Sequence, residues 1–401
     1  MCATTAAVCL FTLSPAGAWA QSAATCVFDP GTAAVTVSLH GLDAKLRAAP
    51  SGDILLDGVS CGGATVSNSD SVQIASNSPF VSERISVSGT FAPGRTPEAT
   101  GISEIEILVN LDRFDDFVVL LGGGADRLRF TANGIDLDND FDTDLVTAGE
   151  FRITVQAGAG DDEIDASAYQ HAQQLLLHGR DGNDRLVGGP LAQNSLYGEE
   201  GNDTLYGGDT YDTLDGGPGD DLMFGRGGED HFPQGTAADG ADDMRGGPGS
   251  DFVDYRWRSN PVSVTLGDAQ PDGEAGEGDK VRGDVENAYG GRADDVLVGN
   301  GANNDLDGWA GDDEVYGGAG NDIVRGSSGN DILVADEGDD VLAGDIGNDF
   351  LDGGPGRDYF HAWDGADTIA NADSFADSVD CGAGTDDAEP DPLDTFVDCE
   401  L

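Results

Sequence analysis

The sequence predicts an all-β protein, a parallel β-solenoid of nine-residue units preceded by an irregular β-rich N-terminal part. From residue 290 to 370 the chain repeats every nine residues without insertion or deletion. In each of these units the sixth residue is Asp or Asn, and the eighth is apolar. A disordered linker has no reason to keep an apolar residue in phase nine times, so we expect an ordered repeat architecture.

Each unit combines a glycine-rich turn with a very short strand. Residues seven to nine alternate polar, apolar and polar, which predicts a strand with one inward side chain. Residues one to six are rich in glycine, as in "GGPGDDLMF" (216–224), and glycine tolerates the backbone of a tight turn. One strand and one turn make half a coil, so we expect eighteen residues per circuit and coils stacked roughly 4.8 Å apart.

Units in the same pattern precede this block. Four units run over 198–233, two more follow at 237–254 after three extra residues, and looser copies occupy 157–165 and 179–187. In a stack, the sixth-position residues line up in a file along each edge. The candidate metal ligands at this position are Asp162, Asp184, Asp203, Asp212, Asp221, Asp230, Asp242, Asp251, Asp295, Asp313, Asp322, Asp331, Asp340, Asp349, Asp358 and Asp367.

A file of carboxylates requires counter-charge. Two carboxylates about 5 Å apart repel by roughly 1 kcal/mol in water and by more where the dielectric is lower. Residues 290–370 carry 19 acidic and 3 basic side chains, so the repulsion accumulates along the stack. Carboxylates and turn carbonyls are oxygen ligands suited to calcium, whereas magnesium requires stricter octahedral geometry. The pattern therefore predicts several bound Ca²⁺ ions.

These units resemble the nonapeptide G-G-x-G-x-D-x-U-x of the RTX (repeats-in-toxin, hemolysin-type) family. "GGPGDDLMF", "GGPGSDFVD" (246–254) and "GGAGNDIVR" (317–325) fit every defined position. The resemblance implies a calcium-binding β-roll in which each ion lies between turns i and i+2. Its implied ligands are the sixth-position carboxylates and backbone carbonyls of the glycine-rich positions, which include Gly201, Gly219, Gly311, Gly320, Gly329, Gly338, Gly347 and Gly356.

The remaining segments suggest how the chain is divided. Residues 1–20 resemble a secretory signal peptide that ends in a small-x-small triplet, although no Lys or Arg precedes the apolar run. We expect an N-terminal cap region (21–156), a first array (157–254), an insertion with one longer strand and an acidic loop (255–289), a second array (290–380) and a C-terminal cap (381–401). Cysteine pairs Cys26–Cys61 and Cys381–Cys399 suggest disulfides at both ends, with free thiols as the alternative.

The composition narrows the functional classes. A net charge of -57 excludes nucleic-acid binding through a basic surface, and no later stretch is apolar enough to span a bilayer. The chain has no H-E-x-x-H zinc motif. We expect a secreted, extracellular protein that is not an enzyme, with a structural or surface-associated role and an unspecified protein or polysaccharide partner. The alternative is an RTX enzyme, carbohydrate-active or hydrolytic, with its site in the N-terminal region.

Overall fold

The computed structural model describes the backbone of strands β1 to β12 between residues 25 and 149, with a few of their side chains. It describes residues 152–171, 174–267, 271–370, 372–389 and 392–399 more fully. The expected signal peptide, 1–20, lies outside these residues. By internal contacts the chain forms two units, Met1–Thr210 and Tyr211–Leu401. The described residues contain strands, turns and bends but no helix, which confirms the all-β class.

Unit 1 begins with antiparallel hairpins and continues as parallel ladders. Strands β1 and β2 pair antiparallel, as do β3 with β4 and β4 with β5. Two parallel ladders follow, β2–β6–β8–β12 and β3–β7–β9–β13. The bounds are β1 Thr25–Asp29, β2 Ala34–Leu39, β3 Ala44–Ala48, β4 Asp53–Leu56, β5 Val59–Thr65, β6 Ser71–Ser76, β7 Arg84–Ser88, β8 Glu106–Leu111, β9 Asp116–Leu120, β10 Arg127–Thr131, β11 Gly134–Asp136, β12 Leu145–Gly149 and β13 Arg152–Ala159.

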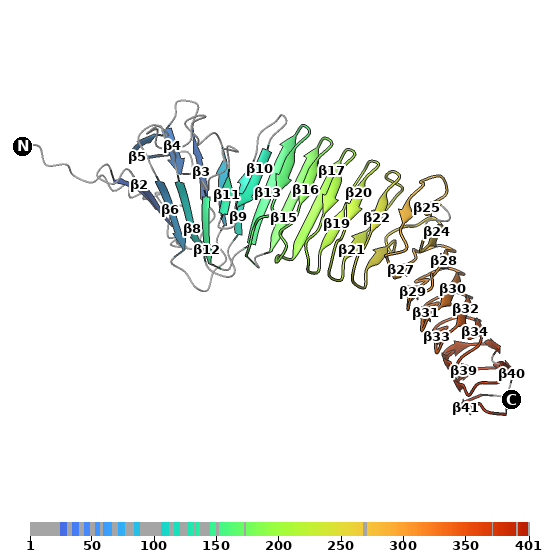
Figure 1. Ribbon diagram of the computed structural model, residues 1–401. Helices are drawn as coiled ribbons and strands as arrows, with labels where there is room; N and C mark the ends of the chain where they lie inside the picture. The colour runs from blue at the N-terminus through green and yellow to red at the C-terminus, as the bar shows by residue number, and fades with distance from the viewer. Residues whose placement is uncertain are drawn as a thin grey trace, which may run out of the picture. The chain divides into compact units, whose positions relative to one another are not determined.

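The looser repeat copies belong to these ladders. Strand β13 pairs in parallel with β15, and β15 with β17, which lie side by side in the green part of Figure 1. A further parallel ladder, on the other side of each coil, runs β10–β14–β16–β18. These strands are β14 Glu163–Asp165, β15 Leu175–Asp181, β16 Arg185–Val187, β17 Asn194–Glu200 and β18 Thr204–Tyr206. The nine-residue repeats at 157–165 and 179–187 are therefore part of the solenoid coils.

Unit 2 contains the regular coils, including β28, β30, β32 and β34 (Figure 1). One ladder runs β27–β29–β31–β33–β35 and advances by eighteen residues at each step, from Asn287 through Asp305, Ile323 and Val341 to Tyr359. The other, β24–β28–β30–β32–β34–β37–β40, advances by the same eighteen residues from Val296 to Thr368. The predicted circuit is thus confirmed.

The strands of unit 2 are mostly three residues long. They are β19 Thr213–Asp215, β20 Leu222–Phe224, β21 His231–Pro233, β22 Asp243–Arg245, β23 Phe252–Asp254, β24 Val262–Thr265, β25 Gly273–Glu274, β26 Lys280–Val281, β27 Asn287–Tyr289, β28 Val296–Val298, β29 Asp305–Asp307, β30 Glu314–Ala319, β31 Ile323–Arg325, β32 Ile332–Glu337, β33 Val341–Ala343, β34 Phe350–Asp352, β35 Tyr359–His361, β36 Asp364–Gly365, β37 Thr368–Ala370, β38 Ser378–Asp380, β39 Ala383–Gly384, β40 Asp387–Glu389 and β41 Thr395–Val397. The three extra residues 234–236 lengthen one circuit to 21, because His231 pairs with Phe252.

The core is a single row of apolar side chains on each face. In the second array the eighth-position residues, such as Leu297, Val324 and Phe360, are fully buried, and their neighbours at positions seven and nine are partly or fully exposed. So thin a core buries little apolar area per residue, and coil stacking must supply much of the stability. Among the described residues, no helix is long and apolar enough to cross a membrane.

Candidate metal centre

The sixth-position aspartates are buried at the ends of the turns. All sixteen predicted ligands have relative exposures of 3 % or less. In the second array they form two files linked by hydrogen bonds of 2.7 to 3.1 Å, in which the backbone N–H of one residue donates to Oδ1 one coil later. The first file is Asp295, Asp313, Asp331, Asp349, Asp367 and Asp386; the second is Asn304, Asp322, Asp340, Asp358, Asp377 and Asp394. The predicted files at the two edges are therefore present.

The same chain of hydrogen bonds occurs in the first array. Within unit 1, Asp162 N–H donates to Asp184 Oδ1 at 2.7 Å, and Asp184 N–H to Asp203 Oδ1 at 2.6 Å. Within unit 2, the links run from Asp212 to Asp230 to Asp251, and separately from Asp221 to Asp242. One carboxylate oxygen of each acceptor is thus used to hold adjacent coils together.

The other carboxylate oxygen is buried and has no hydrogen-bond partner among the described residues. This holds for Oδ2 of Asp184, Asp230, Asp251, Asp313, Asp322, Asp331, Asp340, Asp349, Asp358, Asp367 and Asp386. A buried carboxylate oxygen without a partner carries a large desolvation cost. A repeated row of such oxygens is the arrangement that a bound cation would satisfy.

Burial also makes these carboxyls hard to ionise in the absence of a cation. It raises the pKa of Asp313 to about 8, aided by the charges of Asp295 and Asp331. In the same way it raises the pKa of Asp349 and of Asp358 to about 7. At neutral pH these three carboxyls are therefore partly protonated unless a cation is bound.

In most units the first residue is a glycine that makes room for the carboxylate. A Cβ added to Gly326 would lie 2.2 Å from Oδ2 of Asp331, and the same distance separates a Cβ on Gly216 from Oδ2 of Asp221. The carboxylate therefore lies directly over the first residue of its own unit. Sequence reasoning gave glycine there only a turn role, although its recurrence five residues before the aspartate was a usable signal.

The fourth-position glycines allow close stacking. A Cβ added to Gly329 would lie 1.5 Å from the carbonyl oxygen of Gly311, one coil earlier, and Gly329 has φ of 149°. For seven of the eight glycines named as ligands, an added Cβ would come within 1.4 to 2.4 Å of that preceding carbonyl oxygen; these are Gly201, Gly311, Gly320, Gly329, Gly338, Gly347 and Gly356. The eighth, Gly219, has φ of 148°. Metal ligation by their carbonyls stays a prediction.

The chemistry of the turns fits calcium. Among the described residues, no three His, Cys, Asp or Glu side chains converge on one point. A cation here would take oxygen atoms from the sixth-position carboxylates and from turn carbonyls, and such oxygen donors are those calcium prefers. The aspartates with unpartnered Oδ2 atoms are the residues best placed to hold it.

The files continue beyond the units that the pattern identified. Asp242 N–H donates to Asp279 Oδ1 at 3.0 Å, and Asp251 N–H to Glu286 Oε2 at 3.0 Å. Sequence reasoning missed these two residues because the insertion breaks the nine-residue phase. It also missed an exposed ladder at the fifth position, where Asn330 N–H donates to Asp312 Oδ1 at 2.8 Å.

The predicted C-terminal disulfide, Cys381–Cys399, is present, with Cα atoms 5.1 Å apart. The predicted partners Cys26 and Cys61 lie on β1 and β5, and their side chains fall outside the described residues.

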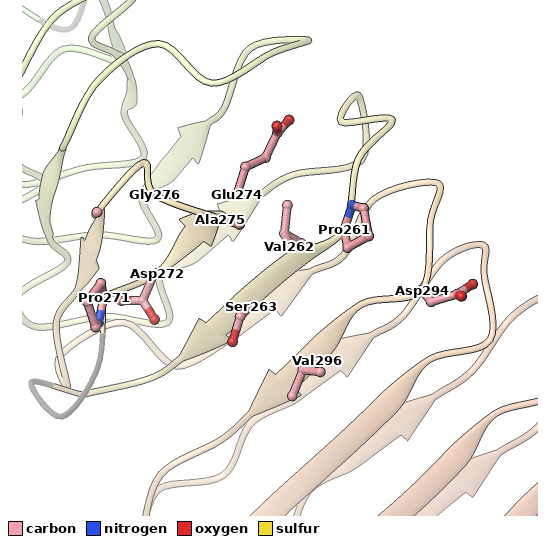
Figure 2. Close-up of a pocket in the computed structure, with 12 residues that line it drawn as sticks. Pro261, Val262, Ser263, Pro271, Asp272, Glu274, Ala275, Gly276, Asp294 and Val296 are labelled. Carbon is pink, nitrogen blue, oxygen red and sulfur yellow. The ribbon is translucent and has the colours of Figure 1, made fainter.

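The insertion contains the predicted longer strand as β24, four residues long. Beside it, a cavity of about 530 Å³ is bounded by Val262 and Ser263 of β24, Val296 of β28 and the segment that carries Asp272 and Glu274 (Figure 2).

Comparison with known proteins identifies the repeats. The family described as RTX calcium-binding nonapeptide repeat (4 copies) matches residues 176–190, 196–232, 236–254, 289–324, 316–351, 325–360 and 343–374. No curated protein matches the chain. The matched segments coincide with the coils whose aspartates form the files. The chain therefore contains RTX calcium-binding nonapeptide repeats between residues 176 and 374, and these repeats form a β-roll.

Proposed function

We propose that this protein is exported, and that calcium drives the folding of its repeats outside the cell. The observation that carries this proposal is the row of buried, unpartnered Oδ2 atoms. With calcium bound, they gain a partner and lose their mutual repulsion. Without it, the stack has a thin core and a high density of glycine, which increases the entropy lost on ordering.

Calcium binding should therefore be linked to folding and should be cooperative. Binding free energy becomes folding free energy when the site exists only in the folded chain, and each ion would join neighbouring coils. Extracellular calcium modules bind in the range of about 10⁻⁴ to 10⁻³ M. A chain in that range stays unfolded at cytosolic calcium levels and folds after export. RTX repeat proteins are typically secreted, and the leader-like residues 1–20 support export here.

We further propose a structural or surface-associated role without catalysis. The carboxylates of the files serve the coil-to-coil links, and their Oδ2 atoms face the turn backbone of their own unit. Catalytic acids need access to a substrate, and these side chains are almost fully buried. Turnover of a polysaccharide or ester by the calcium-loaded full chain would contradict this role.

Circular dichroism of the full chain, titrated with calcium and reversed with EGTA, tests the calcium-driven folding. We expect a cooperative gain of β signal with calcium, reversal with EGTA, and little gain with magnesium at equal concentration. A β-rich spectrum that persists unchanged in excess EGTA would show that the files are stable without the ion and would refute the proposal.

A further inference from the structure

In the insertion, Asp272 and Asp279 are satisfied by the chain's own donors, whereas Oδ1 of Asp284 is buried without a hydrogen-bond partner among the described residues. Asp279 accepts the backbone N–H of Asp242 through Oδ1, as a sixth-position aspartate would. Its Oδ2, however, accepts the hydroxyl of Tyr255 at 2.7 Å. In the repeats the equivalent oxygen of Asp230 or Asp331 has no partner among the described residues. The residues around Asp279 therefore do not fit a calcium site of the repeat type.

A buried arginine supplies positive charge beside this position. The side chain of Arg258 is 0 % exposed, and its Nη2 lies 2.8 Å from both Asp239 Oδ1 and Glu277 Oε1. Its Nη1 lies 3.5 Å from Glu274 Oε1, and its guanidinium group lies 5.7 Å from the ring centre of Tyr255. Burial of a guanidinium is unfavourable unless carboxylates surround it. Arg258 thus places a positive charge among acidic side chains from the inside, the role proposed for calcium in the repeats.

The acidic loop is organised around this arginine. Glu277 Oε2 accepts the N–H of Glu274 at 2.6 Å, and its Oε1 accepts the N–H of Asp239 at 3.2 Å. Asp272 accepts N–H groups from Thr265 and Val281 at 2.7 and 2.8 Å, so both of its oxygens are satisfied. The loop is therefore cross-linked to β24 and β26 by hydrogen bonds that need no ion.

The first two positions of the second array are satisfied in the same way. Asp295 accepts the N–H of Val262 at 2.8 Å through Oδ1 and the N–H of Gly291 through Oδ2. Asn304, which stands where other units have aspartate, donates its amide to the carbonyl of Glu286 at 2.7 Å. The transition from insertion to array thus uses protein donors, and unpartnered oxygens begin only with Asp313 and Asp322.

We propose that the described part of the insertion, residues 255–267 and 271–289, forms with Asp239 and Asp242 a calcium-independent junction, which stays folded when calcium is removed. Arg258 and the Tyr255 hydroxyl replace the cation there. The junction offers strands β24 and β27 as a preformed template on which β28 and β29 pair when calcium returns. Such a template removes the cost of nucleating the first coil of the second array.

Hydrogen-exchange mass spectrometry of the full chain in excess EGTA at pH 7.5 tests this inference. We expect peptides from 255–289 to exchange at least about tenfold more slowly than peptides from 311–360. In Arg258→Met this difference should disappear. The matched control is Arg292→Met, which removes an exposed arginine whose guanidinium group lies over the exposed ring of Trp257, and it should keep the slow exchange.

Equally fast exchange of both regions in the EGTA-treated wild type would overturn the inference. Tyr255→Phe provides a milder variant, because it removes only the hydroxyl donor to Asp279. It should fold normally in calcium and lose protection in EGTA; unchanged protection in EGTA would also count against the junction. If the repeats themselves stay protected in EGTA, the proposed calcium-driven folding fails, and the comparison of the Arg258 and Arg292 variants still decides the junction.

Discussion

In the second array Oδ2 of Asp331 is buried without a hydrogen-bond partner, whereas in the insertion Oδ2 of Asp279 accepts the hydroxyl of Tyr255. Both aspartates hold the same place in a file, since each accepts a backbone N–H through Oδ1. The two regions thus share a backbone arrangement and differ in what balances the carboxylate. The comparison indicates that the coil geometry itself needs no ion, and that the two regions differ in whether Oδ2 has a hydrogen-bond donor.

The regions also differ in how closely their backbones stack. Gly329→Ala should have the largest effect, because the new Cβ would lie 1.5 Å from the carbonyl oxygen of Gly311. We expect the array to lose about 4 kcal/mol of stability. Gly283→Ala in the insertion meets only the Cα of Gly267 at 3.7 Å and should change stability by no more than about 0.5 kcal/mol. Calcium-loaded thermal unfolding of both variants measures this, and similar stability losses would show that the array is not closely stacked.

Acidification should substitute for calcium in the array. The folded-state pKa values of Asp313 and Asp349, about 8 and about 7, lie above the ordinary value of about 4. Protonation therefore favours the folded chain: its contribution is complete below pH 4 and is lost as the pH rises through 7 and 8. In EGTA, the array should gain hydrogen-exchange protection between pH 8 and pH 5. A constant or falling protection would mean that burial does not raise these pKa values.

At the boundary between the two regions, restoring the repeat consensus should be harmful in the absence of calcium. Asn304→Asp replaces an amide donor by a carboxylate that would face the carbonyl of Glu286, now 2.7 Å from the amide nitrogen. We expect a loss of about 2 kcal/mol, the cost of an unpaired buried acceptor. Urea unfolding of the junction in EGTA, followed by hydrogen exchange, measures it. A stabilising effect would show that position 304 belongs to the calcium-dependent array.

We expect the smallest effect, a change in the calcium midpoint of folding, from substitutions of two adjacent aspartates within the array. Asp313→Asn keeps the oxygen that accepts the N–H of Asp295 but replaces the unpartnered Oδ2, so the calcium midpoint should rise about tenfold, or roughly 1.4 kcal/mol. Asp312→Asn changes an exposed residue whose Oδ1 accepts the N–H of Asn330, a role that Asn fills at other fifth positions. Its calcium midpoint should stay near that of the wild type. Equal shifts for the two variants would contradict the assignment of the file.

Much of the coil could be predicted from the sequence because it depends on local periodicity. The eighth-position residues such as Leu333 and the sixth-position residues such as Asp331 recur in phase, and a period of nine fixes which side chains stack. The eighteen-residue register and the two files follow from that period, whereas the burial of the aspartates is seen only in the structure. The disulfide Cys381–Cys399 could also be predicted, because its two cysteines lie close in sequence near the C-terminal end.

Other features were decided only by the tertiary structure. Asp279 and Glu286 join the files across breaks in the phase, and no local pattern marks them, because their partners Asp242 and Asp251 lie 37 and 35 residues away. The segment "YRWR" (255–258) carries no repeat pattern that would predict its role. In the structure, Tyr255 and Arg258 are fully buried among carboxylates of the acidic loop. Composition and period determine how one coil repeats on the next, but compensation of a buried charge depends on which distant residues the fold brings within hydrogen-bond distance.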